Sequence, residues 1–255
     1  MGEVHDRGGK AARSGGSALS RVAAARPVES IRKKSASLPR PRLIDSGSSP
    51  FASWRSRSAW FTLIICSVLG LAVDLGGKWW SFTHGGPDPI PLQRDVLLRH
   101  PEYNPVYPPV RKEVLPHGVI SMHLVLNPGA VFGFGAHRRD FFIGFTVVVV
   151  GIGLAMFALR TTSADRRAHI GIGLALAGGL GNFYDRLFIG RVRDFIQFAP
   201  DLRLPHGWTW PGTNNPEMLP WVFNIADVLL LVGMLMVLGH FRRRRATMAE
   251  SVAAR

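Results

Sequence analysis

The sequence predicts an all-α membrane protein: a bundle of four transmembrane helices, a small extracytoplasmic region that contains β-strands, and a disordered N-terminal extension. Three observations in its 255 residues lead to this fold class. Four apolar blocks are each long enough to cross a bilayer as a helix. Lysines and arginines gather at the two ends of the chain. A single cysteine, Cys66, excludes an internal disulfide framework and a cysteine-based metal site.

Residues 1–57 form the first predicted segment, a basic cytoplasmic extension. They carry about a dozen lysines and arginines against four acidic residues, and they show no apolar periodicity. Such a segment buries too little apolar surface to offset its chain entropy, so we expect disorder. Residues 241–255 form a second basic cytoplasmic tail, which opens with Arg242–Arg245. Nucleic-acid binding would require a folded basic face or interleaved aromatic residues; neither end has them, so no nucleic-acid partner is expected.

The core, residues 58–240, contains the predicted spans. They lie at about 58–76, 141–159, 168–189 and 219–240. Each has about 19 to 22 residues, the length that a helix needs to cross a hydrocarbon layer of about 30 Å. Cytoplasmic loops carry an excess of lysine and arginine, so both chain ends and the loop 160–168 are expected in the cytoplasm.

Two segments, 77–140 and 190–218, are then expected on the extracytoplasmic side. Residues 119–134 alternate enough between apolar and polar side chains to predict short strands. The proline-rich stretch 101–115 is predicted to be irregular.

Polar side chains inside the predicted spans are the main functional signal. A charge at mid-bilayer costs at least about 2.5–3.5 kcal/mol, so such residues face the bundle interior and are functional candidates. They are Asp74, Asn182, Asp185, Arg186, Asn224 and Asp227. In the expected topology they share a depth near the extracytoplasmic face, with Asp227 only about 12 Å from the outer end of its helix. Asn182 with Asp185, and Asn224 with Asp227, are spaced i, i+3, so each helix presents an amide beside a carboxylate.

Two carboxylates held close together suit acid–base hydrolysis. One can be ionised and take a proton from water, while the other stays protonated and polarises a carbonyl group. Asp227 is one candidate, and the spacing leaves open whether its partner is Asp185 or Asp194. Asp185 could instead pair with Arg186 as a structural ion pair. A transporter or scaffold is the main alternative function, and a transporter predicts polar residues strung across the membrane.

Four stretches of the chain resemble the lipoprotein signal peptidase, or signal peptidase II, family. They are VDLGGKWW (73–80), NPGAVFGF (127–134), GGLGNFYDRLFIGRVRDFI (178–196) and FNIADVLLLVG (223–233). Their order and their spacing relative to the spans also agree with the family. The likeness covers roughly residues 58–240 and leaves the N-terminal extension without a counterpart.

The resemblance implies that residues 58–240 are an aspartic intramembrane endopeptidase of the bacterial cytoplasmic (inner) membrane. It would remove the signal peptide from diacylglyceryl-modified prolipoproteins by cutting before the lipidated cysteine. The implied catalytic residues are Asp194 and Asp227. The implied substrate-binding and supporting residues are Asp74, Lys78, Asn127, Gly129, Asn182, Asp185, Arg186, Asn224 and Ala226. The implied partners are prolipoproteins and membrane lipids, with no metal and no organic cofactor; a non-catalytic transporter or a prolipoprotein-binding scaffold is the alternative.

Two residues depart from the family's pattern. Gly77 stands where a hydroxyl residue is common before the lysine. Arg193 stands directly before Asp194, where the family tends to be apolar. A neighbouring cation would favour the ionised form of Asp194 unless the Arg193 side chain points away from it.

Overall fold

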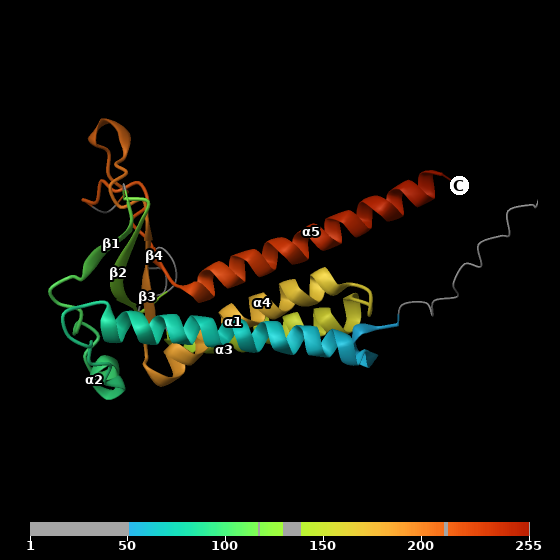
Figure 1. Cartoon of the computed structure of the whole chain (residues 1–255), viewed down its shortest axis with the longest axis horizontal. Coiled ribbons are helices and arrows are strands. Elements are labelled where there is room, and N and C mark those ends of the chain that lie inside the picture. Colours follow the sequence, from blue (N-terminus) through green and yellow to red (C-terminus); the bar gives the residue numbers. More distant parts are fainter. Residues whose placement is uncertain (1–50, 117, 130–138, 212–213, 255) are drawn as a thin grey trace, which may run out of the picture. The chain divides into compact units, whose positions relative to one another are not determined.

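The computed structural model describes residues 51–116, 118–129, 139–211 and 214–254, so the expected N-terminal extension up to residue 50 lies outside the described residues. The helices are η2 (Ser53–Arg55), α1 (Arg57–His84), α2 (Arg94–Arg99), α3 (Arg139–Arg160), α4 (Arg166–Phe188), η4 (Pro205–Gly207) and α5 (Ile225–Ala253). The strands are β1 (Arg111–Leu115), β2 (Ile120–Asn127), β3 (Val192–Phe198) and β4 (Val222–Phe223). Figure 1 shows the sheet at one end of the long helices.

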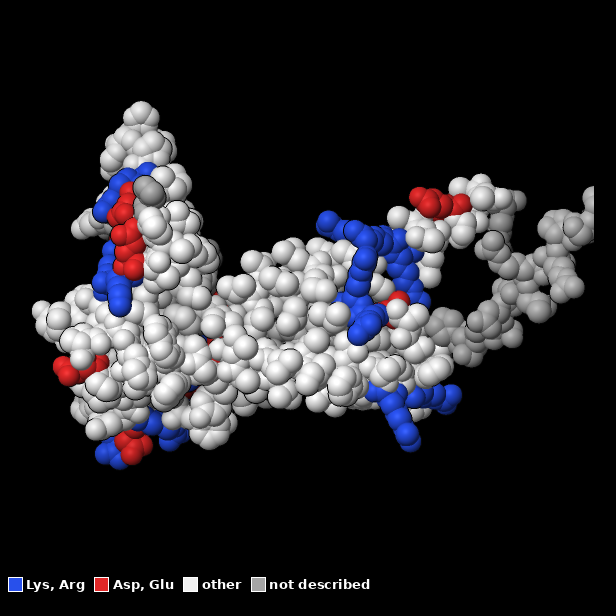
Figure 2. Space-filling model, in the orientation of Figure 1, with Lys and Arg blue, Asp and Glu red and all other residues white. Residues whose placement is uncertain are grey.

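Three of the described helices, α1, α3 and α5, are long and apolar enough to cross a membrane. Large apolar side chains cover their outer faces; examples are Phe61 at 69% exposed, Val148 at 59% and Leu235 at 58%. Such surfaces suit contact with lipid chains. Figure 2 shows lysines and arginines gathered at the two ends of the helices, with an almost uncharged band between them.

The predicted third span, 168–189, is a helix, α4, but it is not among those three apolar helices. It packs against α1, α3 and α5, so much of its surface faces protein rather than lipid. Small residues make this possible: a Cβ atom on Gly178 would collide with the Ala226 carbonyl oxygen, and one on Gly173 would lie 2.9 Å from the Leu63 carbonyl oxygen. The central helix therefore carries the glycines and polar groups that lower its apolar content.

Three helix boundaries differ by more than two residues from the sequence-based ones. Helix α1 continues past residue 76 to His84. Helix α5 begins at Ile225 rather than at 219, because Asn224 and Asp227 form a reciprocal capping box there. It then runs through the expected basic tail to Ala253. Arg, Ala, Met and Glu are good helix formers, which explains why the tail continues the helix.

Residues 51–57 were expected to belong to the extension, but they pack against the bundle. Ser53 is fully buried, and its Oγ lies 2.8 Å from both Thr161 Oγ1 and His169 Nε2. Ser56 caps α1 by accepting a hydrogen bond from the Ala59 amide at 3.2 Å. The expected boundary at residue 57 therefore falls a few residues too late.

The four strands form one antiparallel sheet in the order β1–β2–β3–β4. Strand β2 confirms the expectation of a strand within 119–134, although residues 130–138 lie outside the described part of the chain. The expectation that 101–115 is irregular is wrong for β1. All five residues of β1 are exposed at the sheet edge, so no alternation of apolar residues marks the strand in the sequence.

The sheet packs on the end of α1 through an apolar cluster. Its buried members are Phe82, Leu97, Val106, Met122, Leu124, Leu126, Ile189 and Phe195. Gly190, with φ of +97°, makes the turn between α4 and β3. This packing fixes β3 beside the ends of α1, α4 and α5, where the predicted polar residues lie.

Candidate active site

Asp194 and Asp227 reach the site from different elements. Asp194 lies in the middle of β3, opposite Val125 of β2, and is only 3% exposed. Asp227 lies in the first turn of α5 and is half-buried. The short strand β4 pairs with β3 immediately before α5 begins, so the sheet brings the two acids to the same place.

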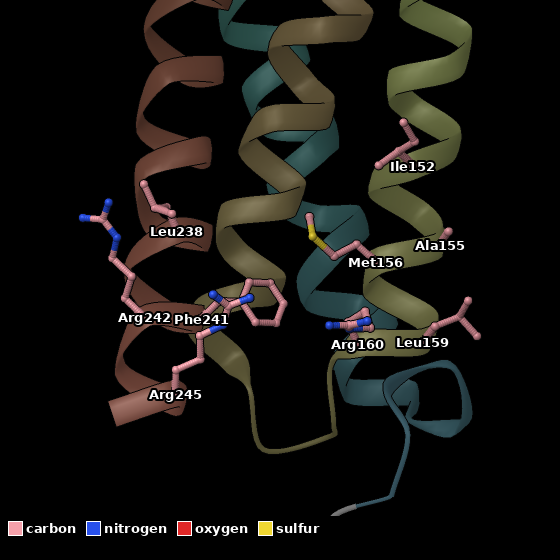
Figure 3. Close-up of a pocket in the computed structure, with 9 residues that line it drawn as sticks. All are labelled: Ile152, Ala155, Met156, Leu159, Arg160, Leu238, Phe241, Arg242 and Arg245. Carbon is pink, nitrogen blue, oxygen red and sulfur yellow. The ribbon is translucent and has the colours of Figure 1, made fainter. Parts of the chain in front are cut away.

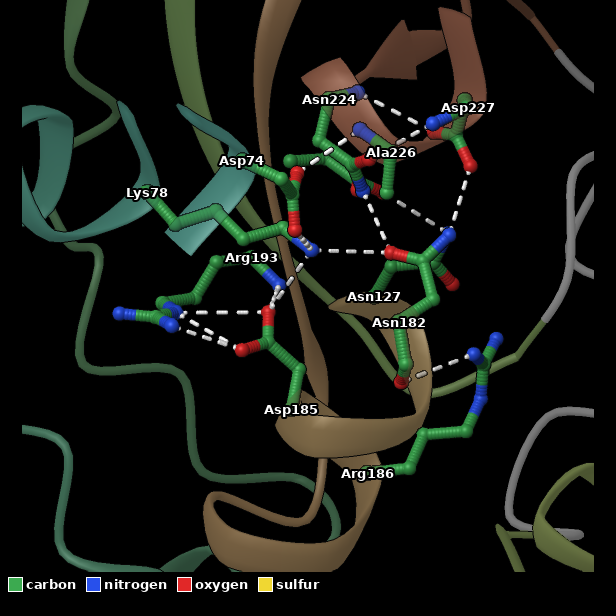
Figure 4. Close-up of polar contacts among 11 residues, drawn as sticks. Asp74, Lys78, Asn127, Asn182, Asp185, Arg186, Arg193, Asn224, Ala226 and Asp227 are labelled. Atoms are coloured by element: carbon green, nitrogen blue, oxygen red, sulfur yellow. Dashed lines mark hydrogen bonds and ion pairs between the residues drawn. The ribbon is translucent and has the colours of Figure 1, made fainter. Parts of the chain in front are cut away.

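Two asparagine side chains connect the carboxylates. The amide of Asn224 donates to Asp194 Oδ1 at 2.6 Å and to Asn182 Oδ1 at 3.0 Å. The amide of Asn182 in turn donates to Asp227 Oδ1 at 2.8 Å. Figure 4 shows the Asn182 and Asp227 side chains pointing toward each other. The amides predicted at i, i+3 from a carboxylate thus connect the two acids across elements.

Asp227 is held by the helix that it starts. Its Oδ2 accepts a hydrogen bond from the Asn224 backbone amide at 3.1 Å, and its own amide donates to Asn224 Oδ1 at 3.0 Å. The N-terminus of a helix carries partial positive charge, which favours a negative charge at this position. The two contacts fix the orientation of the Asp227 side chain, and its Oδ1 points into the site.

Asp194 is in the opposite electrostatic situation. Burial, followed by repulsion from Asp227, raises the pKa of Asp194 to about 8. Hydrogen bonds from Asn127 and Asn224, and the charge of Lys78, oppose this rise. The amide of Asn127 donates to Asp194 Oδ2 at 3.0 Å. At neutral pH Asp194 therefore holds a proton and can act as a hydrogen-bond donor and an acid.

Lys78 forms the centre of a fully buried charge cluster behind the two acids. Its Nζ lies 2.8 Å from Asp74 Oδ2 and 3.5 Å from Asp185 Oδ2, and it donates to Asn182 Oδ1 at 3.0 Å. Asp74 Oδ1 accepts a hydrogen bond from the Ala226 amide at 2.7 Å. Lys78 and Asp74 thereby link α1 to α4 and to the start of α5. Asp74 and Lys78, four residues apart on α1, thus form an ion pair inside the protein.

The proposed ion pair of Asp185 with Arg186 is absent; Asp185 pairs with Arg193. Arg193 Nη2 lies 2.7 Å from Asp185 Oδ1, and the Arg193 amide donates to Asp185 Oδ2 at 2.9 Å. Adjacent residues do not face each other on a helix, which explains why Arg186 is not the partner. Successive side chains of a strand point to opposite faces, so Arg193 points away from Asp194. Its charge is neutralised at Asp185 (Figure 4).

Arg186 and Gly129 close another side of the site. Arg186 donates from Nη2 to the Gly129 carbonyl at 3.0 Å and from Nη1 to the Asn182 carbonyl at 3.2 Å. The Gly129 amide donates to Asn127 Oδ1 at 2.9 Å, which orients the amide nitrogen of Asn127 toward Asp194. These contacts tie the end of β2 to α4.

The structure thus brings together every site residue named from the sequence. Sequence reasoning missed the role of Arg193, because the partner of a buried cation lies eight residues away across a turn. The alternation of a strand after Gly190 is the signal that could have assigned Arg193 to the face opposite Asp194.

Within the described ranges, no group of three or more His, Cys, Asp or Glu side chains could hold a metal ion.

The comparisons with known proteins agree with this geometry. Residues 66–242 match the sequence family described as signal peptidase (SPase) II. The chain is 31% identical over 198 residues to the lipoprotein signal peptidase of Anaeromyxobacter sp. (strain Fw109-5), covering 73% of this chain and 87% of that protein. It is 36% identical over 128 residues to the lipoprotein signal peptidase of Desulfitobacterium hafniense (strain DSM 10664 / DCB-2), covering 48% of this chain and 72% of that protein.

A solved structure described as a bacterial membrane enzyme shares the fold. The TM-score is 0.52 at 22% sequence identity, over 73% of this chain and 91% of the other. The matched residues include most of the apolar helices and every residue of the polar cluster. The chain belongs to the signal peptidase II family of bacterial membrane peptidases.

Proposed function

We propose that the chain removes the signal peptide from diacylglyceryl-modified prolipoproteins by aspartic catalysis, cutting before the lipidated cysteine. One observation carries the proposal: a buried carboxyl that holds its proton, Asp194, lies in a hydrogen-bonded network with a carboxylate at a helix N-terminus, Asp227. The relatives named lipoprotein signal peptidase support the substrate class.

In the proposed reaction the two acids divide the work. Asp227 takes a proton from water, and the water oxygen attacks the carbonyl carbon before the lipidated cysteine. Asp194 donates its proton to the carbonyl oxygen and stabilises the charge that develops there. As the tetrahedral intermediate collapses, the proton held by Asp227 passes to the leaving amine, a hydroxyl group of the intermediate returns a proton to Asp194, and the C–N bond breaks. The pair ends with one proton, as it began.

Asn182, Asn224 and Asn127 are positioning residues in this proposal. Their amides donate to the carboxylate oxygens and leave each acid with one defined orientation. Lys78 supports them, because it donates to the side-chain oxygen Oδ1 of Asn182 and so turns the side-chain nitrogen Nδ2 of Asn182 toward Asp227. The remaining supporting residues are Asp74, Gly129, Asp185, Arg186 and Ala226.

We also propose that α4 crosses the membrane together with α1, α3 and α5, with both chain ends in the cytoplasm. The 23 residues of α4 are long enough, at about 1.5 Å per residue, to span a hydrocarbon layer. The carboxylates then lie near the extracytoplasmic face of the cytoplasmic membrane. The lipid of the substrate stays in the outer leaflet while the scissile bond reaches the acids.

A transporter would need polar groups along the whole membrane path. Apart from His169 near the start of α4, the buried ionisable residues of α1, α4 and α5 gather at the sheet end instead, which favours the peptidase. A scaffold that binds prolipoproteins without cutting them would not need two hydrogen-bonded carboxyl groups. The presence of Asp194 and Asp227 in one network therefore argues against this alternative.

A cleavage assay tests the proposal. The purified full chain is given a prolipoprotein peptide with a diacylglyceryl-modified cysteine, and the same peptide with an unmodified cysteine. Mass spectrometry is expected to show a single cut before the modified cysteine and much slower cutting of the unmodified peptide. Equal cutting of both peptides would contradict the substrate class, and no cutting of either would contradict the proposed activity.

A further inference from the structure

A basic groove lies between α3 and α5 at the end of the helices remote from the carboxylates. It encloses about 760 Å³, and its lining includes Arg160, Arg242 and Arg245 (Figure 3). Arg242 is fifteen residues after Asp227 on α5, which places it about 22 Å along the helix from the catalytic candidate. That separation approaches the thickness of a hydrocarbon layer, so this groove and the acids lie at opposite sides of a bilayer.

The basic groove continues into an apolar slot between α3, α4 and α5. The slot encloses about 310 Å³, and every residue that lines it is apolar. Four residues line both the groove and the slot. They are Ile152, Met156, Leu238 and Phe241. A single molecule with a charged end and an apolar chain can therefore occupy both spaces.

Two arginines of the groove, Arg242 and Arg245, share one face of α5, and Arg160 comes from the end of α3. Phe241 and Arg245 are four residues apart, and Leu238 and Arg242 are four apart, so all four lie along one side of the helix. Arg244 and His240 instead face Asp165, at 3.7 Å and 3.6 Å, on another side.

No acidic side chain lines the groove or the slot, and the described part of the chain gives none of the three groove arginines an ion-pair partner. Three such arginines along one cavity make its surroundings strongly positive, which favours an anion there.

We propose that this groove binds an anionic phospholipid from the leaflet at that side of the membrane. Arg160 and Arg245 hold the phosphate, for which arginine supplies parallel donors, Arg242 adds positive charge at the rim, and an acyl chain fills the apolar slot. A zwitterionic phospholipid carries a positively charged group beside its phosphate, which the arginines would repel, so it would bind less well. The site is separate from the acids, so the inference stands whether or not the proposed peptide cleavage is correct.

Native mass spectrometry of the detergent-purified full chain tests this site. Dioleoyl-phosphatidylglycerol and dioleoyl-phosphatidylcholine are titrated separately, and the fraction of protein that retains one lipid is measured. We expect the protein to retain phosphatidylglycerol at lipid concentrations at least about tenfold lower than those needed for the same retention of phosphatidylcholine. Replacing Arg160, Arg242 and Arg245 together by Gln is expected to remove most of that preference, because each surface arginine contributes about fivefold to the binding of anionic lipid.

The matched control replaces Arg166, Arg167 and Arg243 by Gln. These arginines lie at the same end of the bundle, and the control changes the net charge equally, but none of the three lines the groove. The control is expected to keep the preference for phosphatidylglycerol. Equal losses from the two triple variants would mean that only the overall charge matters and would overturn the site, as would equal retention of the two lipids by the unaltered chain.

Discussion

Asn127 donates from Nδ2 to Asp194 Oδ2 over 3.0 Å. In the proposed mechanism this contact influences the pH above which activity is lost. The hydrogen bond stabilises the ionised form of Asp194 and lowers its pKa, which burial and Asp227 raise to about 8. The Asn127→Leu variant keeps the side-chain size and removes the donor. The pKa of Asp194 should therefore rise further in the variant.

The size of the shift follows from the energy of one hydrogen bond to a charged group, about 1.5–3 kcal/mol. One pKa unit corresponds to about 1.36 kcal/mol, so the loss is worth about one to two units. Asn127 is half-buried, and water can replace part of the lost interaction, so the lower end of about one unit is expected. Protonated Asp194 is the active form, so activity falls as the pH rises through its pKa.

The assay is kcat/KM for cleavage of a diacylated prolipoprotein peptide between pH 6 and 10. The unaltered chain should lose activity near pH 8 with a one-proton slope, and the Asn127→Leu variant should lose it about one pH unit higher, whatever its absolute rate. Asn104→Leu is the control, because the Asn104 side chain bonds only to the backbone of Val106 in a loop outside the site. An unchanged or lower limit in Asn127→Leu would refute the assignment of Asp194 as the acid.

Two further predictions concern the packing that holds the site. Lys78→Met leaves the buried carboxylate of Asp74 without its cation, so the free energy of unfolding in detergent should fall by about 3–5 kcal/mol; a fall below about 1 kcal/mol would mean that the ion pair is not buried. Gly178→Ala should destabilise the bundle by about 1–3 kcal/mol, because the new methyl group meets the Ala226 carbonyl. In the control Gly179→Ala the new methyl group would lie 3.9 Å from its nearest neighbour, so the change should be neutral or stabilising by up to about 1 kcal/mol. Equal effects of the two substitutions on the thermal midpoint would contradict the close approach of α4 and α5.

Hydropathy was sufficient to predict the long helices and to single out part of the candidate site. Apolar length located α1, α3 and α5, and a charge in an apolar block singled out Asp74, Asp185 and Asp227. The choice between Asp185 and Asp194 came from the family resemblance and not from spacing. The reason is that the distance between elements depends on the β3–β4 pairing, which two residues of β4 determine.

Other features depend on contacts that are remote in sequence. The strand β1 has no buried face and so carries no periodic signal. Helix α4 is less apolar than the other three long helices, because it packs against protein on several sides and needs less apolar surface for contact with lipid. Whether Arg193 acts on Asp194 depended on where its side chain points, and the side chain points away and neutralises Asp185. Each of these outcomes follows from which surface a side chain faces, and a local window of sequence does not contain that information.

Cleavage of a diacylated prolipoprotein peptide by the unaltered chain, Asp194→Asn and Asp227→Asn, measured side by side, tests the central claim most directly. Both substitutions are nearly isosteric, so each variant should insert and fold with an unchanged thermal midpoint to within a few degrees. Each should lose cleavage by at least about a thousandfold, because an amide can neither accept the proton from water nor return one. A folded Asp194→Asn or Asp227→Asn protein that cleaves at the rate of the unaltered chain would contradict the account.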